Sequence, residues 1–153
     1  MKARDAVLKL TAAGFIAESS DPHGTGFHVR VILEADQVRA FAAWLLDEGF
    51  FIDFVTAVDA SPACQVIYQF AHYDAPCRIN ARASLPESGT IDTISDIYQG
   101  ADWHERETRD FFGVVFSGHP NLVPLILCDE DKDLKPLLKS EANRKTTDKL
   151  GWG

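Results

Sequence analysis

The sequence predicts an α+β fold: a mainly antiparallel sheet of about four strands, with helices packed on one face, followed by an irregular C-terminal segment. Four stretches alternate apolar and polar residues, whereas other stretches repeat apolar residues at helical spacing. The later strands are separated only by short turn signals, which favours hairpin connections. Without a repeat or a second boundary, we expect one domain over residues 1–139 and a polar, loosely ordered tail over 140–153.

The N-terminal part is predicted to form a helix, a strand and a second helix. Residues 6–13 place apolar side chains at helical spacing, and Gly14 follows as a candidate C-terminal cap. Residues 27–33 alternate, with apolar side chains at the odd positions, which is typical of a half-buried strand. Asp36 then opens an amphipathic helix that ends near Gly49.

Three further strands are predicted at FFIDFVTAVDA, CQVIYQFAHY and CRINARASL, which begin at residues 50, 64 and 77. The turn signals SPA and DAP separate them, so the last pairs are expected to be antiparallel. Four large side chains on the apolar faces of these elements are expected to share one core: Phe41, Leu45, Phe54 and Phe70.

After Leu85 the strand pattern stops and LPESGT is predicted to be a loop. Thr93 with Asp96 forms a capping-box pattern for a short helix closed by Gly100. Asp102 is the expected cap of a second helix, WHERETRDFFG, with a glutamate in the box position. The following GVVFSGHPNLVPLIL is predicted to be extended and interrupted by proline.

Composition excludes several classes of function. The formal net charge is −8, so no basic field is available for nucleic acid, which is not expected as a partner. Three widely spaced cysteines do not match a disulfide framework or a CxxC metal site, and they favour a reducing compartment. No stretch approaches the roughly 20 apolar residues of a membrane span. Any membrane association is therefore expected to depend on another molecule that holds the protein there.

The helical stretch that starts at Trp103 contains candidate catalytic groups. HERET begins like the zinc motif HExxH, but Thr108 occupies the position of the second histidine, so a zinc site is not expected. Glu107 and Asp110 are three residues apart and share a helical face, which leaves a small hydrolase as an alternative. Because arginines flank both acids, salt bridges are the more common use of such a pair.

A helical projection places Glu107 between Trp103 and Phe111. A carboxylate among aromatic side chains must reach a cation or lose its charge. Arg78 or Arg82 of the same chain, or an arginine of another subunit, could supply that cation. We favour the pair within the chain, and the alternative stays open.

The other charged residues of this helix are predicted to lie at the surface. Glu105 and Arg109 are four residues apart and are expected to form an exposed ion pair. Arg106 and Asp110 flank Trp103, and their charges are expected to fix the register of the helix against a partner. Of the two, Arg106 is the residue to which we assign an intersubunit role.

Other candidate sites are weaker. GTG at residues 24–26 precedes a strand, so it is not expected to be a phosphate loop. His119 precedes a proline and is expected to be a structural hydrogen-bonding residue. No cysteine and histidine arrangement indicates a nucleophile, and no cofactor ligation pattern is visible.

The run DIYQGADWHERETRDFFGVVFSGHPNL, residues 96–122, resembles the signature of the thirty-kilodalton subunit of respiratory complex I, the NADH:quinone oxidoreductase. That family includes the small subunit of energy-converting, membrane-bound nickel–iron hydrogenases. The stretch FVTAVDA upstream and KPLLK downstream are also similar to family sequences. The matching motif positions are Glu105, Arg106, Glu107, Asp110, Phe112, Gly113, Phe116, Gly118, His119, Pro120 and Leu122.

The resemblance implies a non-catalytic structural subunit of the peripheral arm, without a cofactor of its own. Its implied partners are the large hydrogenase-like subunit and a neighbouring iron–sulfur subunit, on the cytoplasmic side of the membrane. Both the NADH-linked and the hydrogenase-type assembly stay open, as does a free-standing binding module. The motif positions, together with Trp103 and Phe111, are the expected partner surface.

Overall fold

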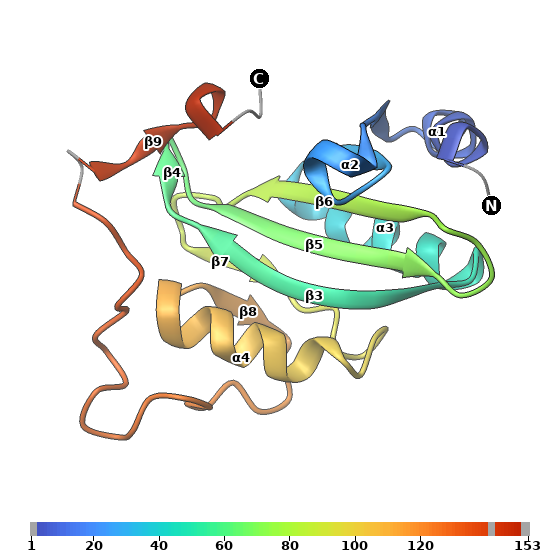
Figure 1. Cartoon of the computed structure of the whole chain (residues 1–153). Helices are drawn as coiled ribbons and strands as arrows, with labels where there is room; N and C mark the ends of the chain where they lie inside the picture. Colours follow the sequence, from blue (N-terminus) through green and yellow to red (C-terminus); the bar gives the residue numbers. More distant parts are fainter. Residues whose placement is uncertain (1–2, 141–142, 151–153) are drawn as a thin grey trace.

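The computed structural model describes residues 3–140 and 143–150. Figure 1 shows a twisted sheet with α3 behind it, α4 along one edge, and a long C-terminal segment that returns to the sheet. The elements, in chain order, are α1 (Ala3–Ala12), β1 (Ile16–Ser19), α2 (Pro22–Thr25), β2 (Val29–Leu33), η1 (Ala35–Gln37), α3 (Val38–Asp47), β3 (Phe50–Val58), β4 (Ala60–Ser61), β5 (Gln65–His72), β6 (Arg78–Ser84), β7 (Thr90–Asp92), α4 (Ala101–Phe112), β8 (Val115–Ser117), β9 (Lys145–Thr146) and η3 (Asp148–Leu150).

The predicted α+β class and the mainly antiparallel sheet are confirmed. The main sheet has five strands in the order β1-β2-β6-β5-β3, and only the β2–β6 pair is parallel. The prediction of about four strands missed β1, whose four residues lie mostly exposed at the sheet edge. A short edge strand buries little surface and so carries little alternation in its sequence.

The helices and the inner face of the sheet share one hydrophobic core. Phe41, Leu45 and Phe70 are buried in it, as predicted. Phe54 was assigned wrongly, because a β-bulge between Ile52 and Phe54 changes the alternation of β3. After the bulge, Val55 and Ala57 face the core, and Phe54 is only half-buried.

The short helix expected between Thr93 and Gly100 is not formed; these residues make turns instead. The side chains of the predicted capping box have other partners. Asp96 accepts two hydrogen bonds of 2.7 Å from Arg39 of α3, and the Thr93 hydroxyl donates to Glu105. Tyr98 still faces the core, where its hydroxyl donates to the Phe50 carbonyl at 3.1 Å.

The predicted loop and extended segment on either side of α4 contain a second, parallel strand pair. β7 and β8 pair in register from Thr90 opposite Val115 to Asp92 opposite Ser117. Phe116 of β8 is buried in the main core. The pairing was missed because each strand has only three residues and just one of them is buried.

The C-terminal segment is held to the body by Asp59, a buried residue at the end of FVTAVDA. Its Oδ2 accepts the Lys139 N–H at 2.7 Å, and Arg144 Nε lies 3.1 Å from Oδ1. Next to this contact, β9 pairs in parallel with β4, where the red and green strands meet in Figure 1. The sequence indicated only a polar tail here and missed the pairing.

Replacing Asp59 with alanine should therefore release the C-terminal segment more than it destabilises the core. We expect residues 143–146 to become the preferred site of limited proteolysis, while the free energy of unfolding falls by about 1–2 kcal/mol. Asp53→Ala, at an exposed position of β3, is the matched control. An unchanged digestion pattern for Asp59→Ala would contradict this role.

Candidate functional site

The signature helix α4 lies along the outer edge of β3 (Figure 1). The Thr108 hydroxyl lies 2.7 Å from the His104 carbonyl oxygen and 3.4 Å from that of Val55 on the edge strand. The buried face of α4 carries Ala101, Glu105 and Thr108, at the spacing of one helical face. α4 therefore covers a sheet edge that would otherwise be open to pairing with another chain.

Glu105 is fully buried on this face, so the predicted exposed ion pair with Arg109 is wrong. One carboxylate oxygen accepts the Ile94 N–H at 2.8 Å, and the other accepts the Thr93 hydroxyl. Burial raises the pKa of the Glu105 carboxyl to about 7, although both hydrogen bonds act to lower it. Glu105 thus joins α4 to the turn that replaces the predicted helix.

His119 closes the same polar cluster from the other side. Its Nδ1 accepts the Asn121 N–H at 3.0 Å, so Nε2 carries the proton and donates to the Asp102 carbonyl oxygen at 3.2 Å. Nε2 lies 3.9 Å from Glu105 Oε2 and 3.7 Å from Asp102 Oδ1. His119 thus makes hydrogen bonds within the chain, as the sequence predicted.

Asp110 is also buried and is an anchor for the chain beyond β8. Its Oδ2 accepts three backbone N–H groups, from Leu125, Ile126 and Leu127, at 2.8–3.1 Å. Oδ1 faces Arg109 Nη1 at 3.2 Å. Burial acts to raise the pKa of Asp110, but the backbone donors outweigh it and hold the pKa below its ordinary value. With its oxygens occupied, Asp110 is poorly suited to acid–base catalysis.

Arg106 binds the same segment instead of extending into solvent. Its Nε donates to the Val123 carbonyl oxygen at 3.1 Å, and Nη2 donates to that of Pro124 at 3.0 Å. Residues 123–127, called the strap below, are therefore held along α4 by one cation and one anion. Arg106 thus has partners within the chain, and its expected intersubunit role stays a prediction.

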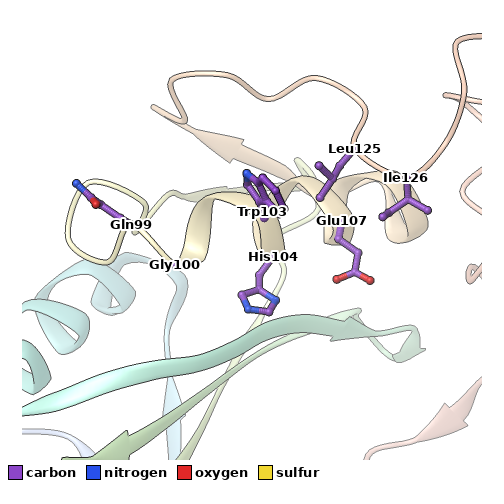
Figure 2. A pocket seen from close by; sticks show the side chains of 7 residues that line it. All are labelled: Gln99, Gly100, Trp103, His104, Glu107, Leu125 and Ile126. Atoms are coloured by element: carbon purple, nitrogen blue, oxygen red, sulfur yellow. The ribbon is translucent and has the colours of Figure 1, made fainter.

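An open groove of about 500 Å³ lies between α4 and the strap (Figure 2). The large apolar side chains exposed along it are Trp103, which is 68% exposed, and Ile126, which is 59% exposed. Its lining residues are Gln99, Gly100, Trp103, His104, Glu107, Leu125 and Ile126.

Glu107 points away from the helix axis in Figure 2, and its side chain is exposed. Within residues 3–140 and 143–150, no cation forms an ion pair with it. Arg78 and Arg82 have other contacts, to the Gly26 carbonyl oxygen at 3.5 Å and to Asn80 at 3.0 Å. The favoured internal ion pair is thus not formed among these residues, because Glu107 faces solvent instead of an aromatic interior.

The remaining motif residues shape the turn after α4. Gly113 ends the helix with φ at +74°, and a Cβ at this position would clash with the Lys135 side chain. Gly118 has φ at +80° before the exposed Pro120. Two half-buried phenylalanines precede this turn: Phe111, whose carbonyl oxygen accepts the Leu137 N–H, and Phe112, which packs on the core.

Sequence reasoning missed several residues that complete the site. Thr93 was interpreted as a helix cap, although its hydroxyl binds Glu105. Leu125 and Ile126 were interpreted only as part of an extended run, although they form one wall of the groove. The one available signal was the apolar run LVPLIL after HPN, interrupted by a single proline, and this run does not identify a partner for the chain. No group of three or more His, Cys, Asp or Glu residues in the described part of the chain could hold a metal ion.

The fold and the signature helix define an α+β domain in which the motif residues mainly stabilise the helix, the turn and the strap. The chain belongs to the family described as the respiratory-chain NADH dehydrogenase, thirty-kilodalton subunit, whose model matches residues 31–147. The resemblance seen in residues 96–122 is therefore confirmed. In the described part of the chain, no helix has the length and apolar character needed to cross a membrane.

Relatives of known sequence carry names from two kinds of complex. The chain is 30% identical to the C subunit of the F(420)H(2) dehydrogenase of Methanosarcina mazei over 144 residues, which cover 91% of each chain. It is 38% identical to the C subunit of the NADH-quinone oxidoreductase of Geobacter metallireducens over 81 residues, which cover 50% of each chain. The second match therefore extends over only half of that relative.

Two solved structures have the same fold. A trypsin-resistant fragment of Nqo5 matches with a TM-score of 0.67 and 26% identity, covering 80% of this chain and all of that fragment. A chain of the membrane-bound sulfane sulfur reductase, an archaeal respiratory membrane complex, matches with a TM-score of 0.78 and 23% identity. That alignment covers 92% of this chain and 88% of the other, and at this identity it shows the fold alone.

Proposed function

We propose that this protein is a structural, non-catalytic subunit in the peripheral arm of a membrane-bound oxidoreductase of the complex I type. It would dock on the large hydrogenase-like subunit beside an iron–sulfur subunit, on the cytoplasmic side of the membrane. Membership of the thirty-kilodalton family supports the kind of assembly. The observation that carries the docking role is the groove where α4 exposes Trp103 beside Ile126.

The non-catalytic role is supported by the way the polar motif residues are used. Glu105 accepts from Thr93 and Ile94, Asp110 accepts three backbone donors, and Arg106 donates to two carbonyl oxygens. Each of these side chains already has partners within the chain. In a hydrolase, Glu107 and Asp110 would instead face a substrate together, but Glu107 is exposed and Asp110 is buried under the strap.

The relatives are subunits of complexes that are named for different electron donors. Those names include both an F(420)H(2) dehydrogenase and NADH-quinone oxidoreductases. The contacts that hold the strap on α4, and α4 on the sheet edge, lie within this chain. They therefore do not depend on which electron donor the assembly uses. We therefore expect this subunit to have the same docking role with either donor module.

The test is co-purification of a tagged, full-length chain from native membranes, followed by mass spectrometry. We expect the large hydrogenase-like subunit and an iron–sulfur subunit in equal amounts with the tagged chain. Membranes from cells with the untagged chain are the control. A tagged chain that elutes alone and monodisperse from these membranes would contradict the docking role and favour a free-standing module.

A further inference from the structure

We infer that the groove beside Trp103 binds a segment of the large subunit that inserts an apolar side chain and carries arginine or lysine next to it. This inference rests on the docking proposed above and states the chemistry of the docking segment. Three observations support it: an exposed aromatic anchor, a groove wall that is fixed before binding, and a negative charge at the groove and on the adjoining loop.

The apolar part of the groove is formed by three side chains from two elements. Trp103 and Ile126 are largely exposed, and Leu125 lies beside them (Figure 2). Tryptophan in such a position is the residue type that most often contributes strongly to binding energy at interfaces. A groove of about 500 Å³ accommodates side chains of an inserted segment. These features favour an apolar side chain of the partner as the main anchor.

The wall formed by the strap is held in place before any partner arrives. Asp110 accepts the N–H groups of Leu125 and Ile126, and Arg106 binds the carbonyl oxygens just before them. The side chains of the strap therefore face the groove from a backbone with satisfied hydrogen bonds. Because the strap is already ordered, less conformational entropy is lost when a partner binds.

The charge of the groove indicates the sign of the charge on the partner segment. Glu107 lines it and forms no ion pair with any residue in the described part of the chain. The sequence DEDKD at residues 129–133 follows Ile126 closely, and all five of its residues are exposed. It carries four carboxylates and one ammonium group. Guanidinium or ammonium groups of a partner would complement both features and steer its approach.

A second copy of this chain is a poor occupant for the same reason. Its net charge of −8 and the same acidic loop would bring like charges together around the groove. The large subunit is the occupant that the proposed docking supplies. A basic segment on it with an apolar side chain would complement the exposed apolar side chains of the groove and the charge of Glu107.

The test uses the intact complex with a photoreactive phenylalanine analogue in place of Trp103. We expect a cross-link to one peptide of the large subunit that has arginine or lysine within a few residues of the modified apolar side chain. A cross-link to another copy of this chain, to an acidic peptide or to a different subunit would overturn the inference, as would the absence of any cross-link.

Two substitutions test the anchor and the charge separately. Trp103→Ala and Glu107→Lys should each lower recovery of the large subunit by about tenfold or more. Tyr73→Ala, at an aromatic residue that is 74% exposed, and Glu87→Lys, at an exposed acid, are the matched controls and should keep full recovery. Thermal melts of the isolated variants should match that of the unsubstituted chain.

The outcomes separate this inference from the proposed function. Equal recovery with all four variants overturns the groove as the contact, while co-purification of the unsubstituted chain still supports docking elsewhere. Failure of the unsubstituted chain to recover the large subunit overturns the proposed function itself, and this inference with it.

Discussion

Replacing Asp110 with alanine is expected to lower the free energy of unfolding by about 3–5 kcal/mol and to release the strap from α4. The side chain is fully buried, and its Oδ2 is the acceptor for three consecutive N–H groups. Alanine removes all three acceptor contacts and leaves Arg109 without its buried anion. Chemical denaturation measures the loss, and hydrogen exchange of residues 125–127 should rise.

Asp110→Asn is the matched comparison, because the amide keeps one oxygen at the position of the acceptor but loses its charge. We expect a smaller cost, about half that of alanine, since charge-assisted hydrogen bonds are roughly twice as strong as neutral ones. Equal stability of the unsubstituted chain and Asp110→Ala would mean that the strap is held by Arg106 and apolar contacts alone.

The second large effect concerns Glu105 and pH. The folded chain has a Glu105 pKa of about 7, raised by burial from its ordinary value of 4.5. Between these values the folded state holds a proton that the unfolded state has lost. The stability that this group contributes is therefore fully present below about pH 4.5 and decreases as pH rises through about 7. The total loss from this group is about 3 kcal/mol.

Glu105→Gln should remove this dependence, because glutamine stays neutral and can still accept one of the two hydrogen bonds. We expect its free energy of unfolding to change less between pH 5 and pH 8 than that of the unsubstituted chain. Glu107→Gln, at an exposed acid of the same helix, is the control and should leave the pH dependence unchanged. Parallel curves for all three proteins would contradict the raised pKa of Glu105.

The pH range over which Glu105 loses its proton is separate from the acid range in which Asp110 loses its charge. Asp110 has a lowered pKa, so its contribution is present above the ordinary aspartate pKa and is lost as pH falls. Measurements from pH 5 to pH 8 therefore lie above the acid range in which Asp110 loses its contribution.

The sequence by itself determined the fold class, most of the main sheet and the family. Alternation at residues 27–33 and in the three later runs predicts strands, and that pattern depends only on side-chain period. The family signature is similarly local, because it is a contiguous run from Asp96 to Leu122. The short strands β1, β7, β8, β4 and β9 were not predictable, since their pairing comes from distant partners.

Only the tertiary structure decided which face of α4 is buried. From polarity alone, the aromatic Trp103 would be expected to be more buried than the charged Glu105. In the fold the order is reversed: Glu105 is fully buried and Trp103 is 68% exposed. The reason is that Thr93, Ile94 and His119 come from separate segments, and they supply the polar environment that lets a carboxyl group lie inside.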